Sequence, residues 1–527
     1  MASKRSLSEP EEVVDFLEGR GPARLKDFLA GQRWFGGKTH GIHTVEVEDW
    51  AVLAPDAPTL LLLLRVDGER YYTPLSVSAA GEFVAADVAG SLEGQTLIDA
   101  HAEPSFGRQL LAAIAAERQL PGRIGRFACH GLPSRAAPTV DETVTVRRIS
   151  GEQSNTSIVF DRSLILKSIR RPQSGINPEL EILHFLTSRT RFGHVPRLAG
   201  WTEYLSPSGE VATLNLLQDF IENDGDGWRY TLATLEDLCE ALERIMGNGG
   251  TEAANDQIGS MAGPLTRDIR ELGAITGGLH AALASDPLLP AFSPEPVTHE
   301  DVGRWCSRIA RELESLTADT TAMSPDSFPN LRVIREALRR ASGHIDAAVG
   351  HIGLLGSART HKIRCHGDYH LGQVLKTDGG FAILDFEGEP ARPLEERRAK
   401  QPPLRDVAGM LRSLNYAVHT TVDRRPPAER ERALGWLAQW ERHARRAFLD
   451  GYGAAVAESP VRLVPRSEEE LARACAVFEL EKACYELRYE LNNRPGWAAI
   501  PAGGILRILE STAVSAGQRA GSPPLTV

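Results

Sequence analysis

The spacing of apolar residues divides the chain into a mixed first part and a helical second part. Apolar positions three and four residues apart predict two helices within residues 11–31, separated by a glycine-rich break. Two apolar runs flank Asp67-Gly68, a dipeptide that favours the tight turn of a β-hairpin. Another helix is expected over residues 105–118. Residues 1–135 are therefore expected to form a small α+β unit.

A second group of strands is predicted over residues 136–222, after a proline- and alanine-rich linker at 133–138. A strand over 143–149 leads into a small polar loop and then a hairpin whose second strand carries Lys167. Backbone N–H groups and hydroxyls of such a loop can face phosphates, and a lysine can reach them as a point charge. The residues assigned to the nucleotide in this hairpin are Lys167, Ser154, Asn155, Thr156 and Ser157. The alternative is an ordinary lysine at a strand end.

A helix should follow the hairpin, with Asn177 as its N-cap and Pro178 in its first turn. It can present Glu181, or less readily Glu179, to Lys167, and such an ion pair would fix the lysine. The alternative is an acidic first turn that only complements the helix dipole. After two more strands we place the hinge between two lobes at 217–224, with Gln218 among the nucleotide contacts.

From residue 229 the pattern is mainly helical. Helices are predicted over 234–246, 265–285, 299–318, 328–349, 427–455 and 467–492. Between the fourth and fifth lies the polar stretch from Cys365 to Gln373, followed by a short apolar run that ends at Asp385. A strand, loop, strand, turn and strand would bring Asp368, Gln373 and Asp385 to one end.

This set suits phosphoryl transfer from ATP. One carboxylate must orient and deprotonate an acceptor hydroxyl, and an amide with a second carboxylate must hold Mg²⁺. We predict Asp368 as the base and Gln373 and Asp385 as the Mg²⁺ ligands. His366 and Arg405 join the catalytic set; Arg405 and Asp406 open a helix whose first turn would brace the loop, or simply cap that helix.

The last predicted helix carries a polar stripe that suits sugar hydroxyls, although a solvated, salt-bridged face fits the same spacing. Its members are Glu479, Lys482, Glu486, Tyr489, Glu490 and Asn493. The residues assigned to the acceptor are His370, Glu387, Glu486, Tyr489, Glu490, Arg494 and Trp497. Two other residues have ordinary explanations: His280 should pack inside a helix bundle, and Trp34 should pack on a sheet.

Composition narrows the class of protein. The 527 residues are enough for two to four domains or lobes, and a net charge of −11 argues against a general nucleic-acid binder. Six cysteines without a CxxC pair indicate buried or free thiols. The N-terminus has no apolar signal segment and the longest aliphatic run, Leu60 to Leu64, is too short for a bilayer, so we expect a cytoplasmic protein without a membrane partner.

Other chemistries fit poorly. His361, His366 and His370 with Cys365 do not have zinc-finger spacing, and there is no HExxH motif. The sequence has neither the GxSxG elbow of serine hydrolases nor a P-loop. A kinase accounts for the lysine strand, the helix acid, the hinge and the two-carboxylate stretch in one chain order.

His366-Gly367-Asp368 with the Asp385 strand resembles the aminoglycoside-phosphotransferase branch of the protein-kinase-like fold. More narrowly, the chain resembles bacterial maltokinases. The passages that carry this resemblance are Gln32 to Lys38, Glu152 to Ser157, Ser174 to Pro178, His366 to Gln373, Asp385 to Pro390, Pro403 to Gly409 and Tyr485 to Trp497. A glycine-poor loop, Gln373 in place of asparagine and Glu387 in place of glycine depart from most kinases but fit the maltokinase-like pattern.

The resemblance implies an α+β, two-lobed kinase-like fold, with an N-terminal cap over 1–135, a nucleotide-binding subdomain over 136–222 and a helical C-lobe over 223–527. It implies transfer of the γ-phosphate of ATP, with Mg²⁺, to the anomeric hydroxyl of maltose, giving maltose 1-phosphate. A glucosamine or other aminosugar or aminoglycoside kinase is the alternative, and a scaffold that binds nucleotide or glucan without transfer is another. We expect a small-molecule sugar as partner and a monomer or homodimer.

Overall fold

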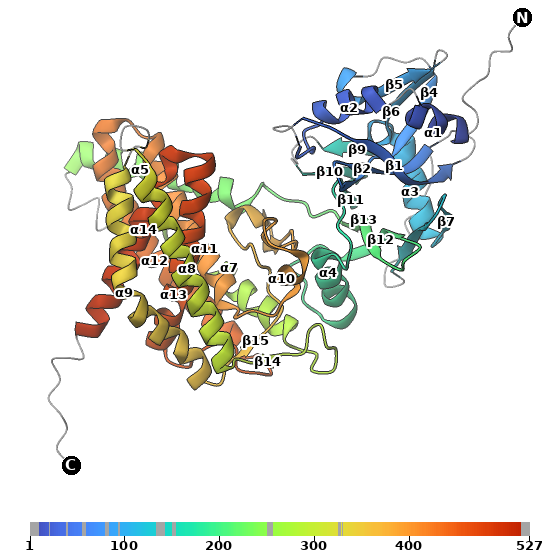
Figure 1. Cartoon of the computed structure of the whole chain (residues 1–527). Helices are drawn as coiled ribbons and strands as arrows, with labels where there is room; N and C mark the ends of the chain where they lie inside the picture. Colours follow the sequence, from blue (N-terminus) through green and yellow to red (C-terminus); the bar gives the residue numbers. More distant parts are fainter. Residues whose placement is uncertain are drawn as a thin grey trace, which may run out of the picture. The chain divides into compact units, whose positions relative to one another are not determined.

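The computed structural model describes residues 10–19, 22–37, 41–54, 59–79, 84–92, 95–132, 143–149, 154–249, 257–324, 328 and 330–517. The predicted linker at 133–138 and the first part of the polar loop, up to residue 153, lie outside these ranges. The chain forms two compact units (Figure 1). The first unit comprises Met1–Arg189 and Val195–Glu222, and the second comprises Thr190–His194 and Asn223–Val527.

The first unit begins with two helices and a six-stranded antiparallel sheet. The helices are α1 (Pro10–Gly19) and α2 (Pro22–Gly31), as predicted. The strands are β1 (Val45–Ala54), β2 (Thr59–Val66), β3 (Glu69–Tyr72), β4 (Leu75–Ala79), β5 (Val88–Leu92) and β6 (Gln95–Asp99), in the order β1-β2-β4-β6-β5 with β3 beside β2. The predicted hairpin is confirmed: Asp67 and Gly68 both have positive φ, as a tight hairpin turn requires.

The aliphatic run in β2 is buried on both faces. Leu60, Leu62 and Leu64 pack with α1 and α2, where Trp34 and Phe35 are buried too. Leu61 and Leu63 belong to a separate core. Because alternate side chains of a strand point to opposite faces, a strand covered on both sides needs a continuous apolar run.

The separate core joins this sheet to a seven-stranded antiparallel sheet through the helix α3 (Pro104–Ala115). The strands are β7 (Gln119–Pro121), β8 (Arg126–Gly131), β9 (Val146–Ile149), β10 (Asn155–Phe160), β11 (Leu164–Ile169), β12 (Leu198–Leu205) and β13 (Val211–Asp219), in the order β7-β8-β12-β13-β11-β10-β9. The helix α4 (Pro178–Arg189) follows β11. Since β7 and β8 already belong to this sheet, the change of sheet comes before the predicted boundary at 135.

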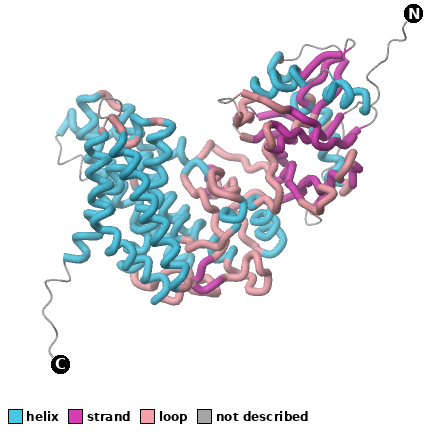
Figure 2. The backbone as a smooth tube through the Cα atoms, in the orientation of Figure 1, coloured by secondary structure: helices cyan, strands magenta, loops and turns pink. Residues whose placement is uncertain are grey.

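The second unit is mainly helical (Figure 2). Its long helices are α5 (Gly227–Gly249), α7 (Gly263–Leu283), α8 (His299–Ala322), α9 (Leu331–Ser357), α11 (Leu404–Arg424), α12 (Arg430–Val456), α13 (Glu468–Asn493) and α14 (Ala499–Gly517), with a short α10 (Leu394–Arg398). Two small antiparallel sheets complete the unit. One pairs β14 (Glu295–Pro296) with β15 (His361–Lys362), which follows α8 and α9, and the other is the hairpin of β16 (Val374–Thr377) and β17 (Gly380–Ile383). The six predicted helices are confirmed, with shifted ends.

Helices α7 and α12 pack backbone against backbone. A Cβ atom on Gly273 would overlap the carbonyl oxygen of Phe448, and one on Gly451 would overlap that of Arg270. Glycine is therefore required at both positions for the helices to approach this closely.

Two of the predictions from composition can be compared with the structure. All six cysteines are buried and unpaired, as expected. In the described part of the chain, no helix is long and apolar enough to cross a membrane.

Candidate active site

Asp406, in the first turn of α11, holds the loop that carries Asp368. Its carboxylate accepts hydrogen bonds from the backbone N–H groups of His366, at 2.7 Å, and Gly367, at 2.9 Å. His280 Nε2 lies 3.1 Å from the same carboxylate. Asp406 is only 2% exposed. Burial raises its pKa, but the hydrogen bond and charge of His280, with the charge of His366 and the Gly367 N–H bond, bring the pKa below its usual value.

The predicted brace is thus confirmed for Asp406 but wrong for Arg405. The Arg405 guanidinium donates to Glu481 at 2.9 Å and lies over the Phe478 ring, so it ties α11 to α13. Arg405 and Asp406 are neighbours in α11, and neighbouring side chains point about 100° apart around a helix, so the two residues meet different partners. His280 is fully buried and contacts the Tyr452 hydroxyl, as expected for a packing histidine.

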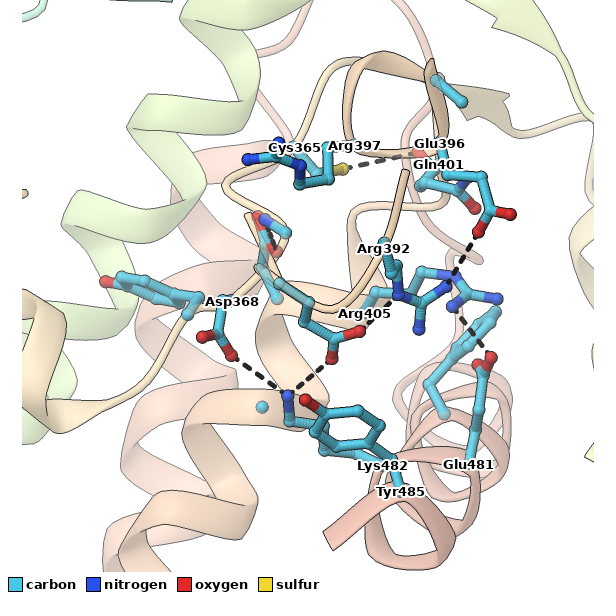
Figure 3. A pocket seen from close by; sticks show the side chains of 17 residues that line it. Cys365, Asp368, Arg392, Glu396, Arg397, Gln401, Arg405, Glu481, Lys482 and Tyr485 are labelled. Carbon is cyan, nitrogen blue, oxygen red and sulfur yellow. Dashed lines mark hydrogen bonds and ion pairs between the residues drawn. The ribbon is translucent and has the colours of Figure 1, made fainter. Parts of the chain in front are cut away.

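Asp368 lies at the wall of a pocket in the second unit, where a lysine meets it (Figure 3). Lys482 Nζ, from α13, is 3.1 Å from Asp368 Oδ1 and 2.8 Å from Glu389 Oε1. Burial disfavours the charge on Lys482, but the two carboxylates raise its pKa above the usual value. Burial likewise raises the pKa of Asp368, but Lys482, His370 and His366 bring it below the usual value. Both groups are therefore charged at neutral pH.

The other acidic side chains of the pocket have partners as well. Glu389 also binds Arg392, and Glu481 binds Arg405 and Arg308. Glu396 lies 3.9 Å from Arg392. The pocket is further lined by Tyr485, Arg397 and Gln401. Its lining carries both carboxylates and cationic side chains, and their charges largely cancel.

Gln373 and Asp385 are brought together as predicted. Gln373 ends the short 3₁₀ helix η3 (Leu371–Gln373), and its Nε2 donates to Asp385 Oδ2 at 2.9 Å. Asp385 follows β17 and has a φ of 63° in the left-handed region, a conformation that a non-glycine residue keeps only under structural constraint. The amide oxygen of Gln373 and the carboxylate of Asp385 are hard oxygen donors of the kind that Mg²⁺ prefers. Gln373 and Asp385 therefore fit an Mg²⁺ ion.

His366 supports the loop from inside and is not among the residues that line the pocket. It is 1% exposed, its Nε2 is 2.8 Å from the carbonyl oxygen of Leu384, and its ring packs against Tyr369 and Phe386. The carbonyl belongs to the residue before Asp385. His366 therefore connects the Asp368 loop to the end of β17, and these contacts are those of a positioning residue.

His370 and Glu387, which the sequence analysis assigns to the acceptor, make local contacts with the backbone. His370 Nδ1 accepts from the N–H of Gly372 at 3.1 Å and so caps η3. The backbone carbonyl of Glu387 accepts from Arg397. Neither side chain is among the described residues that line the pocket.

The carboxylates of the polar stripe on α13 are salt-bridged and buried, whereas Tyr489 and Asn493 of the same stripe are exposed. Glu486 accepts from Arg412 at 2.9 and 2.7 Å, and Glu490 accepts from Arg494 at 3.0 and 2.8 Å. Both carboxylates are largely buried. Beyond them, Arg494 lies between the rings of Tyr489 and Trp497. Among the stripe residues, Lys482 lines the pocket, and Tyr485 of the same helix joins it; the assigned residues Glu486, Tyr489, Glu490, Arg494 and Trp497 are not in its described lining.

In the first unit, Lys167 pairs with Glu179, which the sequence analysis ranks second to Glu181. Lys167 Nζ is 2.7 Å from Glu179 Oε2, and both residues are buried. The predicted cap is confirmed, since the N–H of Leu180 donates to Asn177 Oδ1 at 3.0 Å. This cap fixes where the helix starts. Residues two apart point about 200° apart around a helix, so only one of the two glutamates can face the lysine.

The β10–β11 hairpin separates the assigned nucleotide residues by face. Ser157 is directly opposite Lys167 and Asn155 opposite Ile169, so Ser157 and Asn155 share the face of Lys167. Gln218 pairs with Ile165 and lies on that face too. Thr156 points the other way, and its Oγ1 accepts from Arg170 Nε at 2.8 Å. Ser154 is exposed just before β10.

Sequence reasoning missed the partners of Asp368. Lys482 is 114 residues away from Asp368 in sequence, and the sequence pattern marks it only as one member of the polar stripe on α13. Glu389 lies four residues after Asp385, in the passage Asp385 to Pro390, which carries the resemblance to maltokinases but predicts no role for Glu389. A loop carboxylate needs a counter-ion, but the sequence does not show which of many lysines supplies it.

Comparison with known proteins shows the family to which the chain belongs. Residues 145–448 match the model described as "Phosphotransferase enzyme family". This is more than half of the chain, and the chain belongs to that family. Residues 28–102 match the "Maltokinase N-terminal cap domain". The predictions of a phosphotransferase enzyme and of the maltokinase and aminoglycoside-phosphotransferase relationship are thereby confirmed.

Two curated proteins similar to this chain are glucosamine kinases. The one from Streptacidiphilus jiangxiensis is 26% identical over 369 residues, which are 69% of this chain and 73% of the relative. The one from Mycolicibacterium smegmatis is 26% identical over 367 residues, 69% of this chain and 79% of the relative. A solved structure of a glucosamine kinase in complex with glucosamine, ADP and inorganic phosphate is similar with a TM-score of 0.60 and 21% identity, over 92% of this chain and 99% of that chain. This likeness shows the fold, so the predicted α+β kinase-like class is confirmed.

Proposed function

We propose that the protein is an ATP-dependent sugar kinase whose acceptor is the anomeric hydroxyl of maltose. The observation that carries the proposal is the pocket in which Asp368 meets Lys482. An ionised carboxylate at this place suits a base for a sugar hydroxyl. The match of residues 28–102 to a maltokinase cap supports the choice of sugar.

In this proposal Asp368 accepts the proton of the hydroxyl that attacks the γ-phosphorus. Gln373 and Asp385 would hold Mg²⁺, which neutralises charge on the phosphates when bound. Lys167, fixed by Glu179, contributes a positive charge for the phosphate oxygens. His366 and Asp406 keep the Asp368 loop in place. Positioning and charge stabilisation account for most catalysis of this kind.

The charges of the pocket favour a neutral acceptor. An ammonium group on the substrate would enter beside the Lys482 cation. The carboxylates that line the pocket already have cationic or backbone partners. Glu486 and Glu490, the acids that would attract an aminosugar, are occupied by Arg412 and Arg494.

The second candidate is a glucosamine kinase. It is favoured by two relatives with that name, each 26% identical to this chain. The two candidates differ in the charge of the acceptor, so a direct comparison separates them.

The test is an ATP-consumption assay with maltose, glucose, glucosamine, trehalose and an aminoglycoside, followed by NMR of the product to locate the phosphate. We expect the highest kcat/KM for maltose and a phosphate on the anomeric carbon. A clear preference for glucosamine would refute the maltose assignment and leave the kinase intact. Phosphorylation of none of these sugars, with MgATP bound normally, would refute the sugar kinase.

A matched variant tests the proposed metal ligands. Asp385→Ala should abolish Mg²⁺-dependent nucleotide binding, measured by titration with and without EDTA. Asp378→Ala, in the turn between β16 and β17, is the control and should bind MgATP as the wild type does. Unchanged MgATP affinity in Asp385→Ala would contradict the role of Asp385.

A further inference from the structure

Arg170 joins the two sheets of the first unit at a fully buried point. It directly follows β11, the strand of Lys167, and is 0% exposed. Its guanidinium donates to Asp99 Oδ2 at 2.5 Å and lies 4.7 Å from the centre of the Trp34 ring. Asp99 ends β6 and Trp34 follows α2, so both belong to the segment that matches the cap domain.

The same guanidinium reaches the loop end of β10. Arg170 Nε donates to Thr156 Oγ1 at 2.8 Å. Thr156 is the second residue of β10, immediately after the polar loop. In the described residues, β10 pairs with β9 from Ser157 to Phe160 and with β11 along its whole length. The side-chain hydrogen bond adds a contact between Arg170 and the loop end of the strand.

A second contact fixes the neighbouring residue of β11. Ser168 Oγ lies 2.7 Å from His101 Nε2, and His101 Nδ1 lies 2.7 Å from Asp99 Oδ1. Burial and the nearby Arg170 charge lower the pKa of His101 to about 4, so the imidazole is neutral at pH 7. Ser168 and Thr156 are directly opposite each other, on the face away from Lys167. Asp99 thus supports both strands of the hairpin.

We propose that Arg170 is a positioning residue for the nucleotide, through which the cap fixes the loop end of β10 against the Lys167 strand. Buried hydrogen bonds to a charged group hold their partners in one geometry, because breaking one leaves a charge unsatisfied. Ser157 and Asn155 then stand beside Lys167 in a preformed arrangement. The inference rests on the proposed use of ATP, and gives the cap a part in nucleotide affinity.

The test compares Thr156→Val with Thr156→Ser. Valine has nearly the shape of threonine but cannot accept the Arg170 hydrogen bond, whereas serine can. We expect Thr156→Val to raise the Kd for MgATP and the KM for ATP about tenfold, which corresponds to about 1.4 kcal/mol. The KM for the sugar should change far less. Thr156→Ser should restore most of the ATP affinity.

Two further variants separate positioning from general stability. Trp34→Leu keeps an apolar side chain but removes the ring beside Arg170, and should weaken MgATP binding about threefold, in keeping with the modest strength of cation–π contacts. Arg148→Gln removes a different ion pair between the sheets, from Arg148 to Asp87 at 2.8 Å. It touches neither Thr156 nor Arg170 in the described contacts, and should bind MgATP within about twofold of the wild type.

The outcomes distinguish the two proposals. If the wild type does not bind MgATP, the proposed function fails. If the wild type binds MgATP and folded Thr156→Val and Trp34→Leu bind it equally well, only the role of Arg170 is overturned. If Arg148→Gln weakens binding as much as Thr156→Val, the effect is general loosening of the unit and the proposal is again overturned. Thermal melts of all four variants establish that they fold.

Discussion

Replacing Asp406 with asparagine should both destabilise the second unit and slow the reaction. The carboxylate accepts two backbone N–H groups, at 2.7 and 2.9 Å, and faces His280. An asparagine side chain has one acceptor oxygen, so its NH₂ group would face one of the two N–H groups. The loss of a hydrogen bond to a charged group costs about 1.5–3 kcal/mol, and a buried N–H left unpaired costs about 1–3 kcal/mol.

The sum is about 2.5–6 kcal/mol, which should lower the melting temperature by about 10 °C. A displaced loop should reduce kcat about a hundredfold, since an error of about 1 Å in position has that effect. Thermal melts and steady-state kinetics measure the two effects. Because the folded-state pKa of Asp406 is depressed, its contribution is present above its unfolded pKa and is lost as pH falls through the folded pKa. The stability difference from the wild type should therefore shrink in strong acid.

Two variants on the same helix complete this experiment. Asp423→Asn changes an exposed aspartate of α11 and should leave both stability and kcat unchanged. Arg405→Gln removes the bond to Glu481 and should affect kcat far less than Asp406→Asn. In this variant Glu481 still has Arg308 as an ion-pair partner, at 2.9 Å. A melting temperature and kcat for Asp406→Asn equal to those of the wild type would refute the assignment of Asp406 as the brace.

Three further predictions concern individual charges. Asp368→Asn should lower kcat at least about a hundredfold while the Kd for MgATP stays near normal; near-normal kinetics would remove Asp368 as the base. Glu179→Gln should raise the KM for ATP more than Glu181→Gln does, because Glu179 is the residue that contacts Lys167, and equal effects would contradict this. Lys482→Met should raise the pKa of Asp368, so the acidic limb of the kcat/KM profile should move to higher pH; an unmoved limb would show that Lys482 does not set the ionisation of the base.

The fold could be predicted from local patterns where those patterns are strong. The 3.6-residue periodicity gave the helices, Asp67-Gly68 gave the hairpin, and Asn177 with Pro178 gave the start of α4. The boundary predicted at 135 does not coincide with the change of sheet, because β8 pairs with β12, about 70 residues further along, and β7 pairs with β8. Such pairing depends on contacts distant in sequence, which no local pattern records.

The site was predictable only where residues close in sequence form it. Gln373 and Asp385 are twelve residues apart and meet as expected. The choice between Glu179 and Glu181 depended on the rotation of a helix, which spacing alone could not fix. Lys482 comes from a distant helix. Glu486 and Glu490 of that helix are paired with Arg412 of α11 and with Arg494.

The close approach of α7 and α12 limits how the enzyme can be redesigned. His280 of α7 contacts both Asp406 and Tyr452 of α12, so the position of the Asp368 loop depends on the spacing of these two helices. That spacing is set by backbone atoms at Gly273 and Gly451, where no side chain can be exchanged for a smaller one. A mutant library for a new acceptor should therefore vary Tyr485 on α13 and leave Lys482 and the glycines unchanged. The acceptor preference can then change while the Asp368 loop stays in place.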